Sequence, residues 1–151
     1  MAMTMNGEYE LAVPPQTVWE KLNDAATLKA CIPGCEQLDK TSDTEFQAVA
    51  TVKIGPVKAK FKGRVTLSDL DPPNGYKISG QGDGGVAGFA KGGATVKLAP
   101  KNGGTLLSYN VDAQIGGKLA QLGQRLINGA AKKIADDFFA NFANAVNPKP
   151  A

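Results

Sequence analysis

The sequence predicts an α+β fold in which a curved antiparallel sheet of six or seven strands wraps around one long C-terminal helix. Two observations lead to this prediction. Alternating apolar and polar residues recur between residues 44 and 115, which is typical of half-buried strands. From Lys118 to Val146 the chain has no proline, and apolar residues recur at helical spacing. A sheet with one apolar face must cover that face, and this helix is the only predicted element long enough to do so.

The N-terminal part is predicted to hold one strand and two short helices. Residues 7–13 alternate between apolar and polar side chains, which indicates a strand. Pro14-Pro15 ends this strand and suits the start of a helix, where a missing N–H costs nothing. A second short helix is predicted over residues 24–30, before a turn at Pro33-Gly34.

The middle of the chain alternates in five further segments separated by turns. Residues 44–54 and 57–67 are predicted to form a hairpin about Gly55-Pro56, because proline and glycine favour a tight turn. Further strands are predicted over residues 76–82, around 86–98 and over 105–115.

The C-terminal helix is predicted to be continuous from Lys118 to Val146, which corresponds to a length of about 43 Å at 1.5 Å per residue. Asn147-Pro148 ends it. We therefore expect a single domain over residues 1–147, followed by a short tail at residues 148–151.

Composition excludes several classes of function. The 151-residue chain contains no histidine, which rules out Ser-His-Asp and Cys-His catalysis, histidine-based zinc sites and histidine pH switches. Cys31 and Cys35 are too few for a disulfide scaffold or a four-cysteine zinc site. We interpret them as structural thiols beside a Pro-Gly turn, with redox pairing and metal binding left as alternatives. No cofactor and no metal site is predicted.

Charge and hydropathy indicate where the protein acts. The net charge of +3 does not by itself indicate nucleic acid as a partner. No apolar run approaches the roughly 18 residues of a membrane-spanning helix, and no secretory signal is visible at the N-terminus. We expect a cytoplasmic protein, with the inner face of the cell membrane as a further place of contact.

The predicted inward face of the sheet carries unusually small side chains. Alanine and glycine recur at inward positions of several strands, and Gly123 and Gly129 lie on the facing helix. Small residues on both sides permit two outcomes: the helix lies tightly on the sheet, or a space between them holds an apolar ligand. Mostly apolar pockets of this kind are the usual small-molecule sites. The residues expected to line such a cavity are Phe46, Phe61, Gly63, Ile78, Gly80, Phe89, Leu122, Gly123, Leu126 and Phe138.

The outward face of the central hairpin is predicted to be basic, and no acidic residue lies between residues 46 and 68. It is either a solvated, aggregation-resistant sheet surface or a contact for an anionic membrane or an acidic partner. Aromatic residues do not interleave with these charges, which argues against nucleic acid. This basic surface consists of Lys53, Lys58, Lys60, Lys62 and Arg64.

Two further motifs have structural interpretations. Gly80, Gly82 and Gly85 match the spacing of a dinucleotide-binding fingerprint, but a strand is predicted after them where that motif needs a helix. We interpret these glycines as bends and as a mobile flap at the mouth of the cavity. Lys132-Lys133 and Asp136-Asp137 lie four residues apart, and we expect them to pair on the solvent face of the helix.

Two segments, CIPGCE at residues 31–36 and GGKLAQLGQRLI at residues 116–127, carry a resemblance to a known family. The chain resembles the CoxG family, the G subunits of carbon monoxide dehydrogenase, within the START-like, SRPBCC helix-grip superfamily, over about residues 5–146. The GTLLSY strand at residues 104–109 and the late helix at residues 131–139 are part of it. The resemblance implies a helix-grip fold with an apolar cavity. It also implies an accessory protein of a molybdenum-containing carbon monoxide dehydrogenase-type oxidoreductase, linked to membrane attachment and quinone handling.

We therefore expect a non-catalytic protein that holds a quinone or a similar lipid between the sheet and the long helix and serves such an enzyme. The alternative is an assembly or recruitment factor with a filled core and no ligand. A cyclase or hydrolase is a third hypothesis, and it would need more inward polar groups than Tyr9, Tyr76 and Tyr109. The expected partners are an apolar small molecule, the subunits of the enzyme and, transiently, a membrane surface; nucleic acid is not expected.

Overall fold

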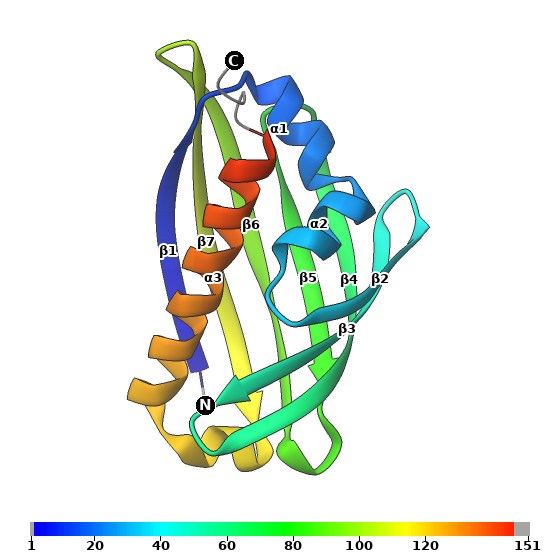
Figure 1. The fold of residues 1–151 in the computed structure, drawn as a ribbon, viewed down its shortest axis with the longest axis vertical. Coiled ribbons are helices and arrows are strands. Elements are labelled where there is room, and N and C mark those ends of the chain that lie inside the picture. The colour runs from blue at the N-terminus through cyan, green and yellow to red at the C-terminus, as the bar shows by residue number, and fades with distance from the viewer. Residues whose placement is uncertain (1, 147–151) are drawn as a thin grey trace.

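A computed structural model describes residues 2–146 of the protein. Within this range seven antiparallel strands form a single curved sheet, with three α-helices on its concave side (Figure 1). The elements in chain order are β1 (Ala2–Leu11), α1 (Pro15–Leu22), α2 (Ala25–Cys31), β2 (Cys35–Ser42), β3 (Glu45–Ile54), β4 (Val57–Asp71), β5 (Gly75–Asp83), η1 (Gly85–Ala87), β6 (Phe89–Lys101), β7 (Gly104–Gly116), η2 (Gly117–Leu122) and α3 (Gln124–Val146).

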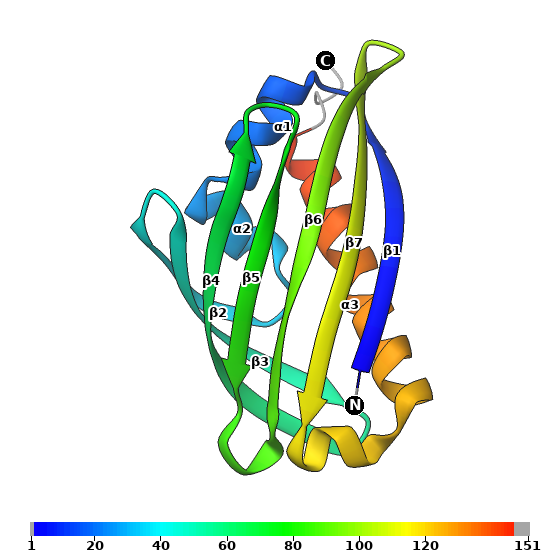
Figure 2. The same ribbon diagram turned by 180° about the vertical axis from the view of Figure 1, so that it is seen from behind.

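The strand order β1-β7-β6-β5-β4-β3-β2 joins strands that are mostly consecutive in sequence. The exception is β1, which pairs with β7 from Ala2 opposite Gln114 to Leu11 opposite Thr105. Because the first strand closes on the last, the sheet curls and β1 lies beside α3 (Figures 1 and 2). The predicted fold class is confirmed, including the two short helices after the first strand.

The short helices begin where the sequence indicates. Pro14 is the N-cap of α1, and Pro15 is its first helical residue. Asp24 caps α2, since its carboxylate accepts hydrogen bonds from the Thr27 backbone N–H at 3.1 Å and from the Thr27 hydroxyl at 2.6 Å. Such a cap satisfies a backbone donor that would otherwise lack a partner. The predicted hairpin of residues 44–54 and 57–67 is also present, as β3 and β4.

Two features of the sheet go beyond the sequence prediction. β1 begins at Ala2 and not at residue 7, so it pairs along most of β7. β2 is not among the predicted strands, because most of its side chains are exposed and its pairing with β3 is interrupted by two register shifts. An edge strand that buries little apolar surface has no alternating pattern to reveal it.

The long C-terminal helix is shorter than predicted. Residues 117–122 form the 3-10 helix η2, and α3 begins only at Gln124. The break lies at Gly123, whose φ of +91° and ψ of 158° are incompatible with an α-helix. Apolar spacing across residues 118–126 suggests one helix, but the backbone turns here through a conformation that glycine adopts most readily. The predicted helix end at Asn147-Pro148 and the tail at residues 148–151 lie outside the described residues.

The apolar core is divided into two clusters. The larger contains Val18 of α1, Leu107 of β7 and Phe142 of α3, and lies toward the end of the molecule where α1 packs. The smaller contains Ile115 and Ile127 with neighbours from η2 and β3, and lies at the opposite end. The middle of the concave face therefore lies between two well-buried ends.

Candidate ligand site

The concave face between the two core clusters is lined by small, half-buried residues. Interiors normally pack as densely as organic crystals, so inward apolar residues that remain accessible indicate unfilled space. An added Cβ at Gly82 would meet only the Cβ of Phe61 within 4 Å, at 4.0 Å, among residues 2–146. The half-buried inward positions are Ala48, Ala50, Ala59, Gly63, Gly80, Gly82, Ala94 and Ala113.

The residues predicted to line the cavity have different environments in the structure. Phe46 is almost fully buried, with 3% exposure, and belongs to the larger cluster. Half-buried side chains pack beside one cluster or the other: Ile78 and Phe138 beside the larger one, and Phe61 and Leu122 beside the smaller one. Gly63 and Gly80 lie on the inward face, but an added Cβ there would come within 3.2 Å and 3.3 Å of a backbone oxygen on a neighbouring strand. Of the inward glycines, Gly82 has the most room beside it.

Three of the predicted lining residues lie elsewhere. Phe89 is 48% exposed, and it pairs with Asp83 and Gly116, so its side chain lies on the outer face of the sheet. The even-numbered residues of β6 face inward, so the odd-numbered Phe89 faces outward. Leu126 is 40% exposed and covers the β3–β4 turn at Gly55. Gly123 lies in the bend before α3 and not on the helix.

An aromatic cluster connects β1, β7 and α3 on the inward side. The Tyr9 ring stacks on Phe139 with centroids 4.2 Å apart, and Tyr109 stacks on Phe139 at 5.4 Å. The Tyr9 hydroxyl donates a hydrogen bond to an Asp136 carboxylate oxygen at 2.6 Å. Burial and this hydrogen bond raise the pKa of Tyr9, so the hydroxyl remains protonated. Sequence reasoning places Asp136 on the solvent face only and does not predict its bond to Tyr9.

The predicted ion pairs on the late helix are confirmed. Lys132 contacts Asp136 and Lys133 contacts Asp137, both at 2.7 Å. The hydrogen bond from Lys132, with that from Tyr9, holds the pKa of Asp136 below its usual value. Asp136 is therefore ionised at neutral pH and accepts hydrogen bonds from both Lys132 and Tyr9.

Cys31 and Cys35 are free thiols. Cys31 is buried in the larger cluster, and Cys35 is half-buried at the start of β2. Burial raises the pKa of both thiols, which disfavours the reactive thiolate. Their environment is that of structural cysteines.

The basic surface is more mixed in charge than the sequence suggests. Its side chains project outward from β3 and β4, but the flanking strands bring acidic residues beside them. Lys60 forms an ion pair with Glu36 at 3.1 Å, and Lys62 lies opposite Asp83 in the sheet register. Lys62 and Arg64 line an open hollow of about 760 Å³ on this outer face.

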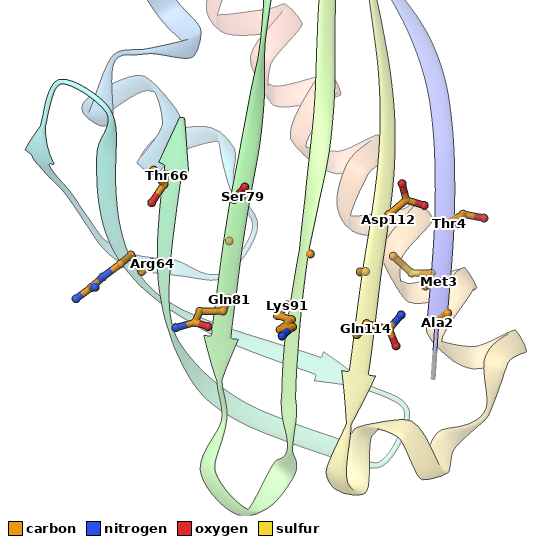
Figure 3. Close-up of a pocket in the computed structure, with 13 residues that line it drawn as sticks. Ala2, Met3, Thr4, Arg64, Thr66, Ser79, Gln81, Lys91, Asp112 and Gln114 are labelled. Carbon is orange, nitrogen blue, oxygen red and sulfur yellow. The ribbon is translucent and has the colours of Figure 1, made fainter. Parts of the chain in front are cut away.

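A second outer hollow, of about 440 Å³, crosses strands β4 to β7 and β1. Figure 3 shows Arg64, Gln81, Lys91 and Gln114 side by side along it. The longer side chains along it, those of Arg64, Gln81, Lys91 and Gln114, are polar and stand on the convex face, so the sheet separates this hollow from the interior. Alternating polar side chains of this kind are typical of a solvated sheet face.

One end of the molecule carries exposed apolar side chains among cations. The β3–β4 turn, η1, η2 and the start of α3 gather there (Figures 1 and 2). Val86 of η1 is 86% exposed, and Phe89 and Leu126 are also exposed. We call these three residues the apolar tip. The cations that lie at this end are Lys53, Lys58, Lys118 and Arg125.

A family model that describes the G subunit of carbon monoxide dehydrogenase (CoxG) matches residues 7–147. The chain belongs to the CoxG family. The match confirms the resemblance seen in the CIPGCE and GGKLAQLGQRLI segments, and the family name denotes a subunit of carbon monoxide dehydrogenase.

Solved structures place this CoxG-family chain in the helix-grip fold. A conserved protein from Geobacillus kaustophilus is 34% identical, with 95% of each chain covered and a TM-score of 0.89. The Zhui aromatase/cyclase from Streptomyces sp. R1128 is 12% identical, with 97% of this chain and 94% of that chain covered and a TM-score of 0.70. Ara h 8.0201 is 15% identical, with 97% and 98% covered and a TM-score of 0.68. The last two show the fold alone.

No curated protein sequence matches this CoxG-family chain. Among residues 2–146, no helix is long and apolar enough to cross a membrane. The family and the fold fit a ligand-binding accessory protein.

Proposed function

We propose that this CoxG-family protein is a non-catalytic carrier that holds an apolar small molecule, a quinone or a lipid, between the sheet and α3. The observation that supports this proposal is the row of small, half-buried residues on the concave face, together with the room for a side chain at Gly82. Burying apolar surface of a ligand there would be favourable by about 25 cal/mol per Å².

The family name supports a carbon monoxide dehydrogenase as the partner enzyme, and we propose that this enzyme is of the molybdenum-containing type. A carrier that binds quinone or lipid would connect such an enzyme to the membrane or to the quinone pool. The inward polar groups are few, and the pKa values of Tyr9 and Tyr76 are raised, so neither is a base at neutral pH. This supports binding in preference to catalysis.

The apolar tip supports transient contact with an anionic membrane surface. Exposed apolar side chains can enter the headgroup region, while nearby lysines and arginines contribute about 1 kcal/mol each beside anionic lipids. Val86 lies on a turn flanked by Gly84, Gly85 and Gly88, so it protrudes from the end of the sheet. Contact at this end would allow ligand exchange with a bilayer without a membrane-spanning segment.

Native mass spectrometry of the protein purified from a quinone-producing host tests this function. We expect a fraction of the protein to carry an added mass that organic extraction releases as quinone or lipid. Protein that remains free of any ligand, and that takes up neither decylubiquinone nor phospholipid added afterwards, would overturn the carrier proposal. That result would favour the alternative of a recruitment factor with a filled core.

A further inference from the structure

A groove of about 360 Å³ runs along the seam between β1 and α3. One wall is the β1 backbone from Met3 to Tyr9, and the other is α3 with Asn128, Lys132 and Asp136. Figure 1 shows the two elements side by side over this length. The groove therefore lies at a boundary of the interior and not on the outer face of the sheet.

Two tyrosines belong both to this groove and to the apolar core. The rings of Tyr9 and Tyr109 pack with Phe139 in the larger cluster, and both residues also line the groove. Their rings thus face the interior, while polar groups gather at the seam. A ligand in the interior could reach these groups without crossing the sheet.

Gly7 explains how the Tyr109 hydroxyl reaches the seam. Gly7 pairs with Tyr109 between β1 and β7. An added Cβ at Gly7 would come within 2.8 Å of the Tyr109 hydroxyl oxygen and within 2.9 Å of its ring carbons. The Tyr109 ring lies across the bare backbone of Gly7, with its hydroxyl directed toward the edge of β1.

The hydrogen bonds at the seam make Tyr109 the donor that can turn to a ligand. The Tyr9 hydroxyl uses its proton on Asp136, which also holds Lys132 at 2.7 Å. A tyrosine hydroxyl donates one hydrogen bond and accepts others. The Tyr109 hydroxyl is hydrogen-bonded to the Tyr9 hydroxyl. Because Tyr9 gives its proton to Asp136, Tyr109 is the donor of this pair, and it can exchange Tyr9 for a ligand oxygen atom in the groove.

We propose that the groove between β1 and α3 binds the polar end of the interior ligand, and that it selects a neutral oxygen-bearing head group such as a quinone carbonyl. This inference rests on the proposed carrier function. An amphiphile in an apolar interior must place its polar end against hydrogen-bonding groups, since burying it without partners is costly. Tyr109 donates to the head-group oxygen, and the stacked rings of Tyr9, Phe139 and Tyr109 pack against the adjoining apolar part.

The charges of the groove favour a neutral head group over a carboxylate. Lys132 and Asp136 form an ion pair and cancel one another. Glu8, an exposed residue on the outward side of β1, borders the groove and adds a negative charge at its rim. A fatty-acid carboxylate would meet this charge, whereas a carbonyl or hydroxyl would not.

Two probes separate the head-group site from the carrier function. Diphenylhexatriene is a fluorescent hydrocarbon without oxygen and reports binding to the interior alone. Decylubiquinone has two carbonyls and should displace it. We compare wild type with Tyr109→Phe, and with Tyr76→Phe as a matched control, because Tyr76 is buried beside Trp19 away from the groove.

We expect Tyr109→Phe to weaken decylubiquinone binding about tenfold, the usual scale of one hydrogen bond, and to leave diphenylhexatriene binding unchanged. Tyr76→Phe should alter neither. Gly7→Ala should reproduce the Tyr109→Phe result by displacing the ring, which gives a second test if Tyr109→Phe folds poorly. Unchanged decylubiquinone affinity in folded Tyr109→Phe, with diphenylhexatriene still bound, would overturn the head-group site and leave the carrier function standing. Failure of wild type to bind either probe would overturn the carrier function itself.

A pair of probes with equal chain length tests the charge preference. We expect 1-dodecanol to displace diphenylhexatriene from wild type at lower concentration than dodecanoate does at pH 7.5. Glu8→Gln should narrow this difference. Equal displacement by the two probes in wild type would overturn the preference for a neutral head group.

Discussion

Gly123 and Gly129 illustrate how differently two glycines six positions apart act on the fold. Gly123 has φ +91° and ψ 158°, a region of backbone space that other residues adopt only at considerable cost. Gly129 lies inside α3, and an added Cβ there would meet nothing within 4 Å among residues 2–146. The apolar spacing in the sequence predicts that both glycines lie in a helix, because this spacing carries no information about whether the backbone angle φ is positive or negative.

Substitution by alanine should therefore have opposite effects at these two positions. We expect Gly123→Ala to lower the free energy of unfolding by about 1–3 kcal/mol, the scale of one strained residue. Gly129→Ala should raise it by up to about 1 kcal/mol, because alanine is the better helix former. Urea denaturation of the two variants measures both. A stabilising Gly123→Ala would mean that the helix continues through residue 123.

The strands show how far periodicity predicts this fold. β3, β4 and β7 alternate cleanly, and the sequence predicts their inward residues correctly down to the small ones. β6 begins with Phe89 on the outer face, and the glycine-rich turn before it offers no alternation from which to set the register. A shift of one residue exchanges the two faces of a strand, so the sequence assigns Phe89 to the cavity while it belongs to the apolar tip.

The apolar tip and the basic surface lead to a prediction about membranes. We expect the affinity for vesicles of phosphatidylcholine and phosphatidylglycerol, measured by co-sedimentation, to fall at least tenfold in the double variant Val86→Ser, Phe89→Ser.

Replacing the basic-surface residues Lys58, Lys60, Lys62 and Arg64 with glutamine should also weaken vesicle binding. The effect should be clearest at low salt, because salt screens charges beyond about 10 Å at 0.1 M. The apolar contribution should persist at higher salt.

Leu70 provides the matched control for the apolar tip. It is exposed to a similar degree as Phe89, but it lies near the β4–β5 turn at the opposite end of the molecule (Figure 2). Leu70→Ser should leave vesicle binding unchanged. Equal losses at both ends would point to nonspecific adhesion, and no loss at the tip would remove this end as the membrane contact.

The whole molecule is a sheet curled around a helix, with a buried cluster at each end and small residues between. Hydrophobic periodicity makes this arrangement predictable, since the alternating strands, the helical spacing of the last segment and the stripe of alanine and glycine are all visible in the sequence. The groove between β1 and α3 is not predictable in this way, because Tyr9 and Asp136 are 127 residues apart in the chain and meet only when β1 closes on β7. Pairing of distant elements does not follow from local pattern.

The unfolding free energy of ligand-free Gly82→Leu, measured in urea against wild type, tests most directly whether the interior is hollow. Gly82 faces inward, and a Cβ there would be 4.0 Å from the Cβ of Phe61. Thr95→Leu, on the outward face of β6, controls for the addition of a leucine to the sheet. We predict that Gly82→Leu is as stable as wild type or more stable, since glycine in a strand costs about 0.5–1 kcal/mol and the new side chain enters empty space. A loss of about 1–3 kcal/mol, the usual cost of overpacking, in Gly82→Leu but not in Thr95→Leu would contradict the hollow interior.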